Sequence, residues 1–199
     1  MLDQRGALAW AIALGFLLVG SVSALAIEVQ PTRPQIEAAL ERGKLAAAAR
    51  TPPDRLYHWF GSSHELEPRG FLMTKLAGLA VMSTHFALRS ATPSDVEITR
   101  ILDERTLLIS LLIFGDHPDF ARDSYVVVQQ GQRTIKPITV RFDGQANRTA
   151  VWPEAPAYRA KVVASFSYSD LDPRARTRIS VFPGTGGEVA FDLDFQEID

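Results

Sequence analysis

The sequence predicts an α+β protein, in which an N-terminal segment of about three helices (residues 27–105) packs on a C-terminal antiparallel β-sandwich of about six strands (residues 106–199). Up to residue 105 the apolar residues recur at the three- and four-residue spacing of a helix. Beyond residue 105 most apolar residues alternate with polar ones, as in half-buried strands. Gly, Pro and Asp residues separate these alternating runs, which is typical of a sandwich.

The first helix is predicted from a start signal and a stop signal. Thr32 can cap the helix, Pro34 lies where no backbone donor is needed, and Gln35 can complete a capping box. Apolar residues then follow on one helical face up to residue 50. The two prolines at 52–53 prevent the helix from continuing.

Two further helices are predicted before residue 105. Residues 71–89 are rich in strong helix formers and carry Lys75, His85 and Arg89 on one polar stripe. This stripe favours a core helix with one solvent-exposed edge over a membrane-spanning helix. The Thr-Pro-Ser-Asp sequence at 92–95 is a helix start signal for a short third helix.

The strands are predicted from apolar runs between turn signals. Residues 106–114 form an unbroken apolar run, typical of a strand that is covered on both faces. The other strands are expected at 124–130, 133–142, 158–168, 177–182 and 189–195. On the last strand, Glu188, Asp192 and Asp194 form an acidic stripe that we expect to face water at a sheet edge, where charge deters aggregation.

Composition excludes several classes of protein. The 199 residues include 21 Lys and Arg against 23 Asp and Glu, a net charge of −2, and no cysteine. These values are those of a folded globular chain and exclude a disulfide-stapled fold. The sequence lacks the basic excess of a nucleic-acid binder, so nucleic acid is not an expected partner. No motif indicates a cofactor.

The first 26 residues have the pattern of an export signal. A short polar start with Arg5 precedes the apolar run 7–19, and the segment ends in Ala24-Leu25-Ala26. Small residues at these positions predict cleavage after Ala26 and a periplasmic or secreted protein. The alternative is an uncleaved N-terminal membrane anchor, because residues 7–26 are about long enough to cross a bilayer. The sequence predicts membrane contact only through this leader, and only if it is uncleaved.

An aromatic segment is the candidate binding site. The candidate binding residues are Tyr57, His58, Trp59 and His64, which lie between helix-breaking prolines and a turn-rich stretch. Aromatic side chains dominate both cores and interfaces. The segment therefore either fastens the helices to the sheet or forms a binding surface.

One loop is a candidate cation site. Its candidate metal ligands are Asp116, His117, Asp119 and Asp123. Carboxylates close in sequence suit a hard cation. The alternative is a solvated strand connection, because Asp and Pro are also the residues that turns prefer.

No catalytic residue is predicted, since the histidines lack the spacing of a zinc hydrolase and no nucleophile elbow is present. The leading hypothesis is an exported bacterial protein that serves as a non-enzymatic binding or structural module of the cell envelope, with an envelope protein or a ligand as its partner. One alternative is an exported enzyme that uses His58, His64, His85 or Asp116 between helices and sheet. The other is a divalent-cation-binding protein.

Overall fold

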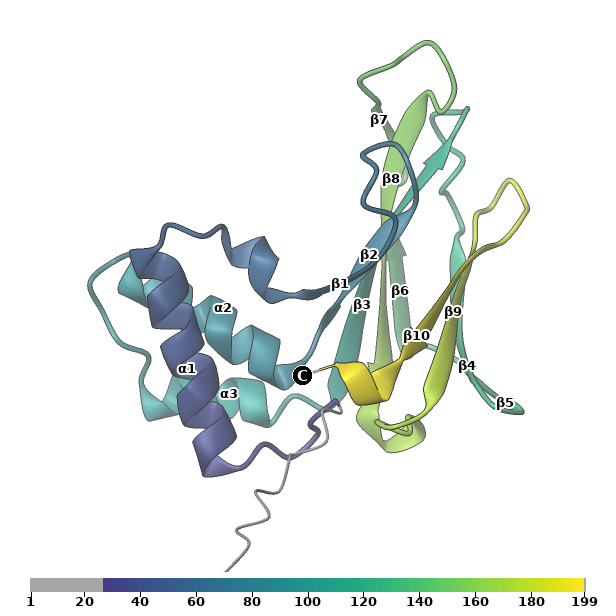
Figure 1. The fold of residues 1–199 in the computed structure, drawn as a ribbon. Coiled ribbons are helices and arrows are strands. Elements are labelled where there is room, and N and C mark those ends of the chain that lie inside the picture. Colours follow the sequence, from purple (N-terminus) through teal and green to yellow (C-terminus); the bar gives the residue numbers. More distant parts are fainter. Residues whose placement is uncertain (1–26, 199) are drawn as a thin grey trace, which may run out of the picture.

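A computed structural model describes residues 27–198, and within this range the predicted α+β class is confirmed. The expected signal segment, residues 1–26, lies outside the described residues. Three α-helices stand on one side of a six-stranded antiparallel sheet, and a four-stranded antiparallel sheet lies on its other side (Figure 1). No helix among the described residues has both the length and the hydropathy needed to cross a bilayer.

The large sheet has the order β1-β2-β3-β8-β6, with β7 also paired to β8, and the small sheet has the order β10-β9-β4-β5. The helices are α1 (Arg33–Ala48), α2 (Lys75–Ala87) and α3 (Asp95–Leu102). The large-sheet strands are β1 (His58–Gly61), β2 (Arg69–Met73), β3 (Thr106–Gly115), β6 (Thr139–Phe142), β7 (Asn147–Arg148) and β8 (Tyr158–Ser167). The small-sheet strands are β4 (Tyr125–Gln130), β5 (Arg133–Ile135), β9 (Arg176–Phe182) and β10 (Val189–Asp194).

The hydrophobic core lies between the two sheets. Leu107, Ile109 and Leu111 of β3 are fully buried and belong to one cluster with Val128 of β4 and Ile179 of β9. Side chains alternate between the two faces of a strand, so the intervening residues of β3 point to the opposite face of the large sheet. That outward face carries the helices.

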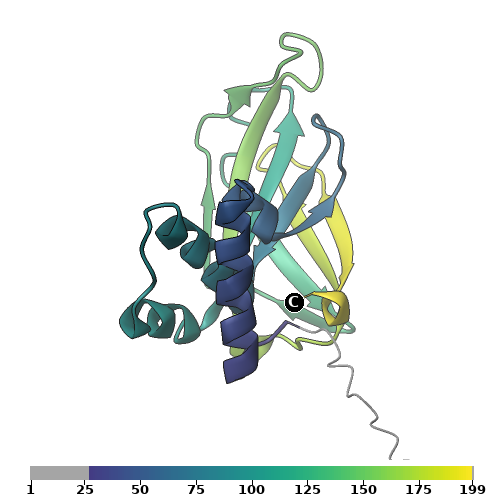
Figure 2. The same ribbon diagram turned by 60° about the vertical axis from the view of Figure 1, so that its left-hand side comes forward.

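α1 and α2 pack closely against each other on that side (Figures 1 and 2). A Cβ atom on Gly43 of α1 would lie 2.2 Å from the carbonyl oxygen of Ala80 of α2, so only glycine allows this approach. The Ser83 hydroxyl donates to the Leu40 carbonyl (2.6 Å), and the Thr84 hydroxyl is shared between the Gly43 carbonyl (3.0 Å) and the Ala80 carbonyl of its own helix (2.9 Å). These directional hydrogen bonds fix the position of α1 along α2, which apolar contacts alone would not specify.

The segment predicted to be wholly helical, residues 27–105, also contributes two strands. The helix expected over 71–89 begins only at Lys75, because the Thr74 hydroxyl caps it by accepting from the Ala77 amide (3.1 Å). The residues before Thr74 pair with β3 as strand β2, and β1 pairs with β2. Short strands beside a strongly helical run were missed because helix-forming residues dominate the window.

The strand count also differs, since ten strands are present among the described residues where about six were predicted. The single strand expected over 133–142 is two strands in different sheets, β5 and β6. Pro137 lies between them and cannot donate to a ladder, so the chain leaves one sheet there and joins the other.

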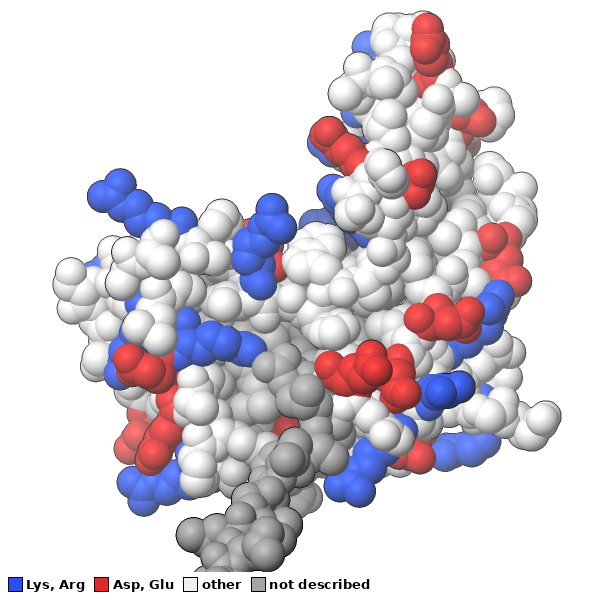
Figure 3. Space-filling model, in the orientation of Figure 1, with Lys and Arg blue, Asp and Glu red and all other residues white. Residues whose placement is uncertain are grey.

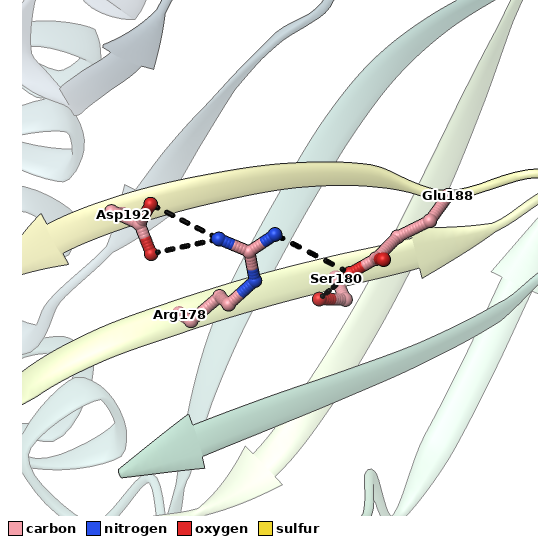
Figure 4. Close-up of polar contacts among 4 residues, drawn as sticks. All are labelled: Arg178, Ser180, Glu188 and Asp192. Carbon is pink, nitrogen blue, oxygen red and sulfur yellow. Dashed lines mark hydrogen bonds and ion pairs between the residues drawn. The ribbon is translucent and has the colours of Figure 1, made fainter. Parts of the chain in front are cut away.

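The acidic stripe of β10 is partly balanced by an arginine of the neighbouring strand. Asp192 lies directly opposite Arg178 of β9, with Nη1 3.1 Å from Oδ2 (Figure 4). The same guanidinium reaches Glu188 at 3.7 Å, and Glu188 also accepts from the Ser180 hydroxyl at 2.6 Å. Asp192 remains 75% exposed, in agreement with the expected water-facing edge strand.

Candidate functional site

A cleft of about 500 Å³ lies between α2, α3 and the outward face of the large sheet. Met73 and Leu108 of the sheet form its floor, while Val81 of α2 and Ile101 of α3 form its walls. The pleat aims the two sheet residues away from the core and toward the helices. Its volume lies within the range of small-molecule sites, and its lining is mainly apolar.

The amino group of Lys75 is held at the edge of this cleft. Lys75 is the first residue of α2 and is 9% exposed, and its Nζ donates to the carbonyl of Leu102 at the end of α3. Burial lowers the pKa of Lys75, and the nearby carboxylates of Asp103 and Glu104 offset part of this effect. The Nζ atom also lies 5.5 Å from the centre of the Tyr168 ring. Lys75 thereby joins α2, the end of α3 and the short 3₁₀ helix Tyr168–Asp170 that follows β8.

Tyr168 is the second buried polar residue of the cleft. Burial raises the pKa of its phenol, and the charge of Glu104 raises it further, whereas a hydrogen bond with the Lys75 backbone lowers it. The Glu104 carboxylate is already hydrogen-bonded, because its Oε1 accepts from the backbone amides of Arg105 and Thr106. The cleft therefore presents apolar walls with the Lys75 ammonium, the neutral Tyr168 phenol and the charged side chains of Arg100 and Glu104. A mainly apolar lining with a few polar groups suits binding more than proton transfer.

A row of aromatic rings extends the cleft along the outward face. Tyr57 lines the cleft and stacks on Phe71 at 4.5 Å between ring centroids, and Trp59 also contacts Phe71, in a tilted arrangement at 5.1 Å. The indole N–H of Trp59 donates to the Asp54 carbonyl (2.7 Å), which ties β1 to the preceding 3₁₀ helix, Pro53–Leu56. Trp59 is nevertheless 40% exposed. Burial, with a smaller contribution from Asp54, raises the pKa of Tyr57.

The structure brings together two of the four predicted binding residues. Because residues 58–61 form a strand, Tyr57 and Trp59 lie on the side of the helices, whereas His58 points to the other face. Its neighbour Phe60 shares that face and contacts Phe191 of β10 edge-on at 5.1 Å. His64 lies exposed in the loop between β1 and β2.

The predicted metal ligands lie in the turns that follow β3. Asp116 accepts from the amide of Ala157 (3.4 Å), and the carbonyls of His117 and Asp119 accept the backbone hydrogen bonds of successive turns. Within residues 27–198, no group of three or more His, Asp or Glu side chains is placed to hold a metal ion. The geometry gives the cation hypothesis no support.

The residues proposed for an enzyme are also dispersed. Of the described residues that line the cleft, none is a histidine, and Asp116 is not among them. His85 is exposed near the end of α2. Lys75 and Tyr168 were missed as site residues, because neither stands in a recognisable motif; only the polar stripe of the second helix pointed to Lys75.

Comparisons with known proteins identify no family. No family model and no curated protein matches the chain. One similar solved structure is the archaellum periplasmic stator protein complex FlaF and FlaG from Sulfolobus acidocaldarius. The match covers 45% of this chain and 77% of that chain, with 12% identity and a TM-score of 0.28. A likeness of this size carries no argument about fold or function.

Proposed function

We propose that the chain is an exported, non-enzymatic binding module of the cell envelope, and that it holds the apolar part of a ligand in the cleft between its helices and its large sheet. The cleft carries this proposal. It combines an apolar lining, a volume of about 500 Å³ and a small number of polar groups at one edge, which are the usual properties of a ligand site.

The polar groups of the cleft favour binding over catalysis. The Lys75 amino group is bonded to the Leu102 carbonyl, and Glu104 is occupied by backbone amides. An acid or base must be free to reach the proton that it transfers. These groups instead orient a bound molecule, for example through an acceptor atom next to Lys75.

The envelope location rests on the leader sequence, residues 1–26, with its apolar run and small-residue ending. A β-sandwich that carries a helical layer on one face is a suitable scaffold, because its inter-sheet core is separate from the cleft. Ligand binding at the cleft therefore leaves that core undisturbed.

The test is a variant that fills the cleft. Gly78 of α2 lines it, and the only atom close to a Cβ at this position is Cγ2 of Ile101 at 3.4 Å. A dansyl-labelled fatty acid is the probe, since its fluorescence rises in an apolar site. We expect the wild-type chain to bind it and Gly78→Leu to lose binding. Ala48→Leu, at an exposed position of α1, is the matched control and should bind as the wild type does.

Two outcomes contradict the proposal. The first is a wild-type chain that leaves the probe fluorescence unchanged. The second is equal binding by Gly78→Leu and Ala48→Leu, which places the probe outside the cleft. Circular dichroism of both variants establishes that each is folded.

A further inference from the structure

The outward face of the large sheet becomes cationic beyond the part that the helices cover. Strand register places Arg69 of β2 opposite Leu112 of β3, and Leu112 opposite Lys161 of β8. Residues that pair directly across antiparallel strands share a face. We call this surface the cationic face; its residues are Arg69, Leu112, Phe114, Arg141, Arg159 and Lys161.

The cations of this face are not neutralised by ion pairs. Within residues 27–198, the side chains of Arg141, Arg159 and Lys161 make no ion pair or hydrogen bond. The Arg69 guanidinium lies 5.9 Å from the Trp59 ring centre, and its buried Nε has no hydrogen-bond partner. On the small sheet, in contrast, Arg178 is held between two carboxylates (Figure 4).

The cationic face is one wall of a notch. Figure 3 shows the molecule hollowed between the helices and the upper part of the large sheet, with Lys and Arg side chains on both sides of the hollow and Asp and Glu side chains at its rim on the sheet side. Two smaller depressions follow the cleft along this wall. The lining of one, of about 330 Å³, includes Asp54, Arg55, Trp59 and Arg69, and the lining of the other, of about 270 Å³, includes Phe114, Arg159 and Glu65.

Shape and spacing select the kind of partner. A flat lipid surface cannot reach the floor of a notch, whereas an extended chain can. Arg159 and Lys161 are two residues apart on β8, about 7 Å, which is also the separation of alternate side chains in an extended polypeptide. Apolar Leu112 lies between Arg69 and Lys161, and Phe114 lies opposite Arg159, so a matching ligand presents aliphatic groups on the same side as its anions.

We propose that the cationic face binds an extended acidic segment of a partner polypeptide, in which glutamates at every second position share the side that faces the sheet. The glutamate carboxylates pair with Arg159 and Lys161, and the methylene groups of the same side chains pack on Leu112 and Phe114. Glu65, at the rim, opposes such a ligand by repulsion. This surface is separate from the cleft and goes beyond the function proposed for it.

The experiment uses the full chain and a fluorescein-labelled peptide in which glutamate alternates with serine, with binding followed by fluorescence anisotropy. Replacing two unpaired cations of the face, Arg159→Gln with Lys161→Gln, should weaken binding on the order of tenfold. The matched control, Arg122→Gln with Lys136→Gln, removes the same charge at exposed positions outside the face and should change affinity little. Glu65→Gln should strengthen binding.

Other outcomes overturn the proposal. Equal weakening by the two double variants means that only net charge matters. Tighter binding to phosphatidylglycerol vesicles or to an oligothymidylate than to the peptide assigns the face to a different class of partner. The Arg159/Lys161 variant should still bind the dansyl-labelled fatty acid, so failure here is distinguishable from failure of the cleft proposal.

Discussion

Two glycines of the helical layer should respond in opposite directions to the same substitution. In Gly43→Ala, the added Cβ would lie 2.2 Å from the Ala80 carbonyl oxygen and 2.6 Å from the Ser83 Cβ. The helices must then separate, which breaks the hydroxyl bonds of Ser83 and Thr84 to α1. In Gly78→Ala, the only close atom is the Ile101 Cγ2 at 3.4 Å, an ordinary contact.

The magnitudes follow from these contacts. Replacing a helical glycine by alanine stabilises a helix by about 1 kcal/mol in both variants. At Gly43, this gain is outweighed by two lost hydrogen bonds of about 1 kcal/mol each and by about 1–3 kcal/mol of overpacking. Gly43→Ala should therefore destabilise the fold by about 2–4 kcal/mol, and Gly78→Ala should stabilise it by about 1 kcal/mol.

Thermal unfolding followed by circular dichroism measures both changes. A chain of this size shifts its Tm by about 2–4 °C per kcal/mol, so Gly43→Ala should lower Tm by roughly 5–15 °C and Gly78→Ala should raise it by about 2–4 °C. Shifts of the same sign and similar size in the two variants would refute the packing described for α1 and α2.

Three further predictions concern titration, the leader and the edge strand. The fold raises the pKa of Tyr168, so above about pH 10 the unfolded chain loses the phenol proton while the folded chain keeps it. The free energy of unfolding of the wild type therefore decreases as the pH rises. In Tyr168→Phe this decrease, measured by denaturation at alkaline pH, should be smaller by about 1.4 kcal/mol per pH unit. Mass spectrometry of the exported protein should find Ile27 as the first residue, and an intact leader contradicts the predicted cleavage. A double-mutant cycle for the pair Arg178–Asp192 should give no more than about 1 kcal/mol, decreasing with salt, since the pair is exposed; a larger, salt-insensitive coupling is incompatible with this geometry.

The long elements were predictable because their signals are local. The capping box at Thr32 is present, and the apolar run from Thr106 forms β3, the central strand of the large sheet. The strand β8 also follows the predicted alternation. In β8 the alternation indicates which face is buried, whereas β3 is indicated by its unbroken apolar run.

The site depends on pairing that sequence alone does not reveal. Residues 58–61 were seen as an aromatic segment, and only their register with β2 separates Trp59 from His58 onto different faces. Lys75 and Tyr168 are far apart in the sequence and come into contact because α2 packs beside the end of β8. Such contacts are set by tertiary packing, which overrides local preference.

The cationic face was hidden for the same reason. Its arginines and its lysine are scattered over three strands, and the near-zero net charge of the whole chain conceals their clustering. Composition argued against a basic surface in general, whereas strand register gathers the cations locally.

The most direct test of the cleft as a ligand site is an NMR titration of the isotopically labelled chain with the dansyl-labelled fatty acid. We predict that the methyl resonances of Val81, Ile101 and Leu108, which line the cleft, shift on binding. The methyl resonances of Val126 and Ile179, in the core between the sheets, should stay in place. Shifts in the inter-sheet core with an unchanged cleft would contradict the account.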